Sequence, residues 1–185
     1  MRPAGRRGDS TCARAPVGWL LLAVGCGTAH AVFSAIWATG SDLLLVTVGD
    51  VADRVAAMGE WRRMLLLGGI ALLKGGVTLG LVLDSRGLLG RGRVCDLVRS
   101  GEFVVGAGLL AYGLVTMAVS GRRLVVALGA YEPEPATVAA SWGHLLIWDP
   151  LFVLWGMGTA AYVVRASRRP SGLRRPVRPE EEGGR

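Results

Sequence analysis

Four long and almost uninterrupted apolar runs constrain this chain more than any other feature of its sequence. The runs cover residues 17–39, 64–83, 103–119 and 138–164. Each is close to the roughly 20 apolar residues that a helix needs to cross a hydrocarbon core about 30 Å thick. A soluble amphipathic helix carries a single apolar stripe, whereas these runs are apolar on all sides. The sequence therefore predicts an all-α integral membrane bundle of four transmembrane helices.

The basic residues indicate the orientation of this bundle. Of the 21 Lys and Arg residues, fifteen lie in the two tails and the second loop, and five lie in the first and third loops. Because Lys and Arg concentrate in cytoplasmic segments, the N- and C-termini are both predicted to be cytoplasmic. The chain then divides into a basic tail (1–16), a transmembrane domain (17–166) and an Arg-, Pro- and Glu-rich tail (167–185) that we expect to be disordered. The expected location is the cell (plasma) membrane, as a multi-pass protein.

The N-terminus also has features of a secretory signal peptide. Four arginines precede an apolar stretch that contains Ala29-His30-Ala31, which is similar to an A-x-A cleavage site. However, the apolar run continues beyond this point to Trp37 and is long enough to span a bilayer. We therefore expect the first helix to be retained.

Several function classes are disfavoured by composition and spacing. The formal net charge of +7 could indicate nucleic-acid binding, but the basic residues lie in the tails and between the runs, where membrane topology accounts for them. Cys12, Cys26 and Cys95 form no CxxC pair, which disfavours a metal site. His30 and His144 fall at unmatched depths and make a poor pair of haem ligands. We expect no nucleic-acid partner, no metal, no cofactor and no catalytic residue, and thus no enzyme.

Three ionisable residues, His30, Lys74 and Asp149, fall inside the predicted spans. Lys74 is the eleventh residue of its run, about 15 Å along a helix that rises 1.5 Å per residue. A charge at that depth costs roughly 2.5–3.5 kcal/mol on insertion scales. We therefore expect Asp149 to pair with His30, Lys74 or both. This polar cluster either fixes helix register or forms a proton relay or a polar substrate pocket.

Proline and glycine residues suggest how the helices are shaped and packed. Pro150 lacks an N–H group and its ring clashes with the carbonyl group of Leu146, which predicts a kink within a long fourth helix. The alternative is a helix that starts at Pro150 with Asp149 as its N-cap. Gly76 and Gly80 form a GxxxG pattern, and Gly156 belongs to a similar one. Small residues allow close helix packing within one chain or between copies in a homo-oligomer.

The connecting segments carry weaker signals. Residues 50–58 have helical spacing with an apolar face, which suggests a short helix at the membrane interface, and residues 124–128 suggest a second one. The segment 132–135, Glu-Pro-Glu-Pro, is typical of an extended start to the fourth helix.

Two segments also resemble a known family. Residues 30–40 (HAVFSAIWATG) and 146–156 (LIWDPLFVLWG) are similar to the first-helix and last-helix motifs of small four-helix integral membrane proteins common in high-GC actinobacteria, a family of unknown function. The resemblance implies a membrane location and a four-helix fold over residues 17 to 166, with no assigned activity. It places His30, Trp37 and Asp149 among the positions of most interest.

These observations give two functional expectations. The first is a multi-pass membrane protein, structural or accessory and not enzymatic, with a buried polar cluster of His30, Lys74 and Asp149 and the lipid bilayer as its partner. The alternative is a small transporter or proton-coupled permease subunit that uses the same cluster.

Overall fold

The computed structural model describes residues 17–89 and 93–167, and this part of the chain is helical without strands. The predictions for the tails, at residues 1–16 and 168–185, lie outside the described residues. The elements in chain order are α1 (Val17–Ala38), the 3₁₀ turn η1 (Leu45–Val48), α2 (Asp50–Ala56), α3 (Glu60–Ser85), α4 (Arg93–Leu128), α5 (Pro135–Gly143), the π-helical turn η2 (His144–Trp148) and α6 (Asp149–Ser167). Within the described residues, four helices are long and apolar enough to cross a membrane, which confirms the predicted fold class.

Three of the four long helices extend beyond the predicted spans. The first differs little, since α1 ends at Ala38. The second and third runs, 64–83 and 103–119, lie within α3 and α4, which have 26 and 36 residues. The length of an apolar run reflects the thickness of the hydrocarbon core that the helix crosses. The backbone hydrogen bonds of the helix continue through the polar residues on either side of the run. For the same reason, residues 124–128 do not form a separate interface helix but are the last turn of α4.

The fourth helix is continuous from Pro135 to Ser167 and passes through Pro150 without a break. It begins as predicted, with Glu134 in an extended conformation and Pro135 in the first turn. The turn before Pro150 is the π-helical η2, in which the Asp149 N–H donates to the carbonyl oxygen of His144. Because proline cannot donate to Leu146 and crowds its carbonyl group, the chain accommodates Pro150 by widening this turn. The N-cap alternative is thus wrong.

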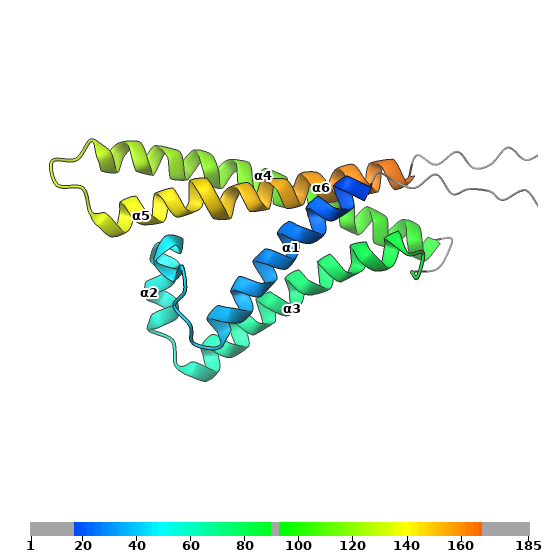
Figure 1. Cartoon of the computed structure of the whole chain (residues 1–185), viewed down its shortest axis with the longest axis horizontal. Helices are drawn as coiled ribbons and strands as arrows, with labels where there is room; N and C mark the ends of the chain where they lie inside the picture. Colours follow the sequence, from blue (N-terminus) through cyan, green and yellow to red (C-terminus); the bar gives the residue numbers. More distant parts are fainter. Residues whose placement is uncertain (1–16, 90–92, 168–185) are drawn as a thin grey trace, which may run out of the picture.

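The long helices form two packed pairs, α4 with the α5–α6 helix and α1 with α3. Contacts between α1 and α6 join the two pairs (Figure 1). In the figure α4 runs alongside the α5–α6 helix, and α1 crosses between α6 and α3. The start of α1 lies beside the end of α6, where the Arg165 guanidinium carbon is 5.0 Å from the centre of the Trp19 ring. We call this the terminal end of the bundle, and the opposite end, with η1, α2 and α5, the far end (Figure 1).

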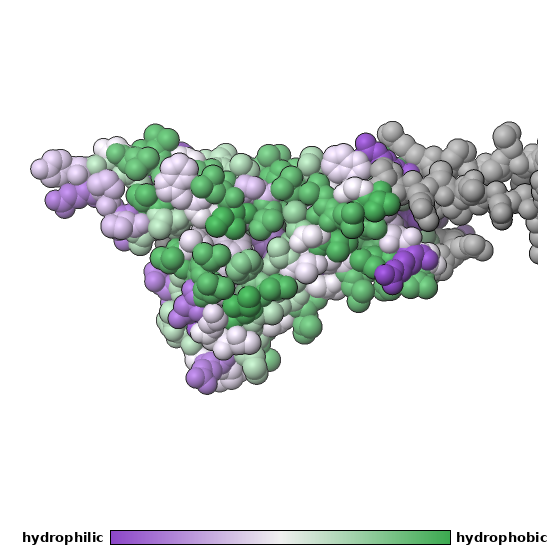
Figure 2. Space-filling model, in the orientation of Figure 1, coloured by the Kyte–Doolittle hydropathy of each residue, from purple (hydrophilic) through white to green (hydrophobic). Residues whose placement is uncertain are grey.

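The buried core lies between the helices in two clusters. One, along α1, α3 and α6, contains Ala23, Cys26, Leu81, Trp155, Tyr162, Val163 and Ala166. The other, towards the far end, contains Trp37, Leu45, Val55, Leu67 and Trp148. Through Val55, which is 2% exposed, it includes the predicted short helix as α2. Large hydrophobic side chains also remain outside, such as Leu72 and Val125 at 78% and 73% exposed, and they cover much of the face in Figure 2. Such a surface suits lipid rather than water.

Glycines set the closest approach between α4 and α6. A Cβ atom on Gly156 would lie 2.5 Å from the carbonyl oxygen of Gly106 and closer still to the Leu110 backbone nitrogen. Among the other predicted packing glycines, a Cβ on Gly80 would meet only a Glu102 oxygen, at 3.6 Å, and one on Gly76 would meet nothing within 4 Å. Gly76 therefore packs against no neighbouring helix of the described chain, and its alternative role in contacts between copies stays a prediction.

Candidate functional site: two buried carboxylate networks

The carboxylate of Asp149 forms the centre of a network at the far end of the bundle. Asp149 is 1% exposed, and its Oδ1 atom lies 3.0 Å from His144 Nδ1. The Ser120 hydroxyl of α4 donates to Oδ2 at 3.3 Å. His144 and Asp149 are five residues apart, which is the hydrogen-bond spacing of a π turn. The turn η2 therefore places both side chains on one side of the helix, and we call Asp149, His144 and Ser120 the far-end network.

The order of contacts in the far-end network decides what chemistry it can do. In a hydrolytic triad the imidazole lies between the serine and the carboxylate, so that it can take the serine proton. Here the carboxylate lies between, and the Ser120 hydroxyl donates to Asp149 rather than to His144. This arrangement holds α4 against α6 and orients the imidazole, but it leaves the serine without a base.

Asp149 does not pair with His30 or Lys74, its two predicted partners. His30 stacks on Phe152, with ring centroids 3.9 Å apart, and also on Trp155. Lys74 donates to the Ser34 hydroxyl at 3.0 Å, and its Nζ lies 5.7 Å from the Phe152 ring centroid. The structure thus brings His30 and Lys74 together around Phe152, whereas Asp149 is bound by His144 and Ser120.

A second buried carboxylate, Asp84, lies at the terminal end and joins three helices. Asp84 belongs to α3 and is 4% exposed. Arg99 Nε of α4 lies 3.0 Å and 3.2 Å from its two oxygens, and the Tyr162 hydroxyl of α6 donates to Oδ2 at 2.8 Å. The Cys95 thiol is a weaker donor, at 3.7 Å. We call Asp84, Arg99, Tyr162 and Cys95 the terminal-end network.

Sequence reasoning missed the terminal-end network because Asp84 and Arg99 fall just outside the predicted spans. In the predicted topology Arg99 belongs to the second loop and counts among its cytoplasmic charges. The positions of these residues indicate that each continues a membrane helix. Asp84 directly follows the second apolar run, and Arg99 lies about one helical turn before Phe103, where the third run begins. Tyr162 carries no sequence signal, because the partner of its hydroxyl group lies on α3, 78 residues away in the chain.

Between the two networks lie buried polar atoms that make no hydrogen bond to any described residue. They are His30 Nε2, Trp155 Nε1, Thr159 Oγ1 and both carboxylate oxygens of Glu102. Glu102 is 8% exposed and lies on α4 opposite Gly80 of α3. A buried polar group without a partner costs roughly 1–3 kcal/mol, and more if it is charged. Such a group in a native structure calls for a functional explanation or an unseen partner.

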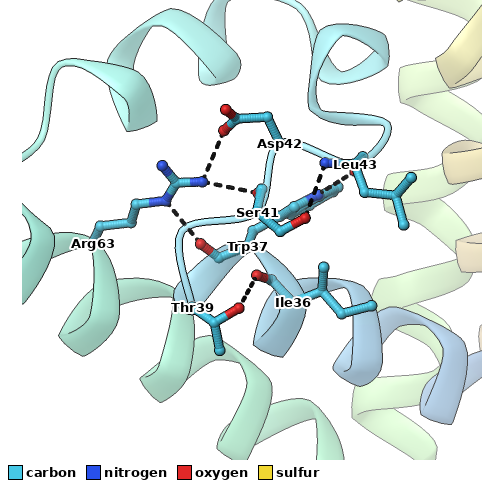
Figure 3. Close-up of polar contacts among 7 residues, drawn as sticks. All are labelled: Ile36, Trp37, Thr39, Ser41, Asp42, Leu43 and Arg63. Atoms are coloured by element: carbon cyan, nitrogen blue, oxygen red, sulfur yellow. Dashed lines mark hydrogen bonds and ion pairs between the residues drawn. The ribbon is translucent and has the colours of Figure 1, made fainter.

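Arg63 fixes the loop that follows α1 (Figure 3). Its Nε donates to the Trp37 carbonyl oxygen at 2.8 Å, one of the last carbonyl groups of α1. Its Nη2 donates to the Ser41 carbonyl oxygen at 2.9 Å and to Asp42 Oδ1 at 3.0 Å. The Trp37 indole in turn donates to the Leu43 carbonyl oxygen at 2.7 Å. One guanidinium group thus satisfies a helix end and orders the turn towards η1.

Replacing Arg63 with lysine is expected to loosen this loop. A lysine keeps the charge but lacks the planar fork, so it cannot reach three acceptors at once. The expected cost is about 1–3 kcal/mol of local stability, the value of one or two charge-assisted bonds. Hydrogen exchange of residues 39–48 should be faster in Arg63→Lys, whereas the neighbouring Arg62→Lys should match the parent chain. Equal protection in Arg63→Lys would mean that these bonds do not hold the loop.

The arrangement shows no known metal or family signature. Within residues 17–89 and 93–167, no three His, Cys, Asp or Glu side chains gather as a metal-ligating group. Comparison of the chain with protein-family models, curated proteins and solved structures finds no match. The resemblance to small four-helix membrane proteins therefore stays a prediction.

Proposed function

We propose that this chain is a non-enzymatic, multi-pass membrane protein with a structural or accessory role, in which buried charges hold the helices in one arrangement. The observation that carries the proposal is the bonding of Asp84: this 4% exposed carboxylate accepts hydrogen bonds from Arg99 of α4 and Tyr162 of α6. In a membrane, apolar surface gives little preference for one helix pairing over another, whereas polar contacts between helices are specific. A charge shared by three helices is suited to fix their relative positions.

The far-end network supports the same role. The Ser120 hydroxyl group and the His144 imidazole both form hydrogen bonds with the Asp149 carboxylate. The Ser120–Asp149 contact lies about midway along the α5–α6 helix and the Asp84 contacts lie near its end, so the two networks limit sliding at two separate levels. We propose that the terminal end faces the cytoplasm and that the membrane is the plasma membrane, on the basis of the predicted distribution of Lys and Arg between the two sides.

A second candidate function, a proton-coupled permease subunit, is favoured by Glu102. Ionisable side chains within membrane segments often belong to proton relays. Both Glu102 oxygens are buried and make no hydrogen bond to a described residue, so no structural contact in the described residues accounts for this carboxyl group. His30 Nε2 is also buried and makes no hydrogen bond to a described residue. Lys74, bound to Ser34, places a third ionisable group in this interior.

Proton flux in reconstituted vesicles separates the two candidates. The full chain is inserted into liposomes with an internal pH-sensitive dye, and a pH step is applied outside. A structural role predicts the same proton leak as in protein-free vesicles, for the parent chain and for Glu102→Gln. A relay predicts a faster leak that Glu102→Gln abolishes, whereas the exposed Glu60→Gln control retains it. The latter result would overturn the structural proposal.

A further inference from the structure

A cavity lined by both polar and apolar side chains opens at the far end of the bundle, between η1, α2, α4 and α5. Its volume is about 330 Å³, and its charged lining consists of Asp53 from α2, Arg123 from α4 and Glu134 at the start of α5, together with the imidazole of His144. The Thr137 hydroxyl donates to Glu134 Oε2, at 2.6 Å, and orients that carboxylate. The cavity thus presents one guanidinium group and two carboxylates to whatever occupies it. This size is at the lower end of the range for small-molecule sites, roughly 300–1,000 Å³.

A second cavity, whose lining is mainly apolar, lies directly beside the first and shares two residues with it. It has a volume of about 500 Å³ and is lined by Val119, Arg122, Arg123, Val126, Ala127 and Thr137. Arg123 and Thr137 line both cavities. The valines belong to the outer surface of α4, where Val126 is 66% exposed. A charged compartment therefore continues, across Arg123, into an apolar compartment on the surface that suits lipid.

We propose that the two cavities together bind one phospholipid with a primary-amine headgroup. Arg123 would take the phosphate group, since a guanidinium fork matches two oxygens of a phosphate. Asp53 and Glu134 would take the ammonium group. An acyl chain would run from Arg123 along Val119, the part of this lining that leads back into the predicted span 103–119. This inference goes beyond the structural role and needs only that the helices cross a membrane.

Charge and continuity select this ligand over its closest competitors. An anionic headgroup could pair its phosphate with Arg123, and with Arg122 in the second compartment, but it would leave Asp53 and Glu134 without a cationic partner. A choline headgroup carries its charge on methylated nitrogen and cannot donate hydrogen bonds to Asp53 and Glu134. A water-soluble zwitterion would leave the apolar compartment unused. The primary-amine phospholipid uses both carboxylates, the arginine and the apolar surface.

Lipid retention by the purified chain tests the proposal. The full chain is placed in nanodiscs with equal amounts of phosphatidylethanolamine, phosphatidylcholine and phosphatidylglycerol, released, and analysed by native mass spectrometry. We expect phosphatidylethanolamine to be retained at least about tenfold over the other two, as expected when charge-assisted hydrogen bonds are gained. The double variant Asp53→Asn/Glu134→Gln should lose this preference, and Arg123→Gln should lose retention of all three lipids. Glu132→Gln and Arg86→Gln, at exposed residues that line neither cavity, should match the parent chain.

Two results would overturn the proposal, and each identifies a different occupant. Equal retention of phosphatidylglycerol, lost only in Arg123→Gln, would indicate a simple anion site. Free phosphoethanolamine binding as tightly as the whole lipid, and lipid retention unaffected by Val119→Ser, would indicate a site for a soluble zwitterion. The substitutions lie at exposed residues, and unchanged thermal unfolding of each variant will show that it is folded.

Discussion

Replacing Gly156 with valine is expected to separate α6 from α4 and to lower the free energy of unfolding by about 3 kcal/mol or more. Overpacking costs typically about 1–3 kcal/mol when side chains can adjust, and more when they cannot. Here a Cβ atom on Gly156 would meet the Gly106 carbonyl oxygen at 2.5 Å and the Leu110 Cα at 2.9 Å. Both are backbone atoms of α4, so no change of side-chain rotamer can relieve the overlap.

Denaturant titration of the purified chain in micelles, followed by tryptophan fluorescence, measures this effect. Trp155, which is 2% exposed and packs against α1, is one of six tryptophans whose emission reports on global unfolding. The matched control is Gly76→Ala, because a Cβ at that position would meet nothing within 4 Å. Alanine is preferred over glycine within a helix by about 1 kcal/mol, so this control should be neutral or stabilising. A Gly156→Val chain as stable as the parent would mean that α4 and α6 do not approach at this glycine.

Replacing Arg99 with methionine is the second change with a large expected effect. It removes the charge partner of Asp84 while leaving an apolar side chain of similar reach. Breaking a buried ion pair from one side typically costs about 3–5 kcal/mol, because the remaining charge stays buried without its partner. The hydroxyl group of Tyr162 would still donate to Asp84, but it cannot replace a positive charge.

The same titration checks this prediction with two further variants. Arg86→Met removes an exposed arginine two residues after Asp84 and should change stability by less than about 0.5 kcal/mol. Asp84→Asn added to Arg99→Met removes the stranded charge and should recover much of the loss. If Arg99→Met alone were no more destabilising than Arg86→Met, the ion pair would contribute nothing to the bundle.

The four-helix fold could be predicted from the sequence because the bilayer imposes a length. Only a helix of about 20 apolar residues crosses the hydrocarbon core with its backbone groups satisfied, and four runs meet that requirement. The ends of the helices could not be predicted in the same way. Polar residues such as Asp84 and Glu102 continue α3 and α4 beyond their apolar runs, and composition does not distinguish a polar helical turn from a loop.

The candidate site was predicted only in part, for a geometric reason. Depth along each span placed His30 and Lys74 in the interior, and the structure brings them together around Phe152. Depth does not give the rotation of a helix about its axis. The turn η2 changes this rotation just before Asp149, so that its carboxylate meets His144 and Ser120. A single π turn leaves no pattern in the sequence apart from the proline that follows it.

A double-mutant cycle between Asp84 and Arg99 measures whether buried charges hold the helices together. The free energies of unfolding of the parent chain, Asp84→Asn, Arg99→Met and the double variant give the coupling between the two side chains. Contacting residues in one network couple by roughly 0.5–3 kcal/mol, and independent residues add within about 0.3–0.5 kcal/mol. If they do, the coupling is stabilising and exceeds about 1 kcal/mol. Additive effects would show that the Asp84–Arg99 pair does not hold the helices together.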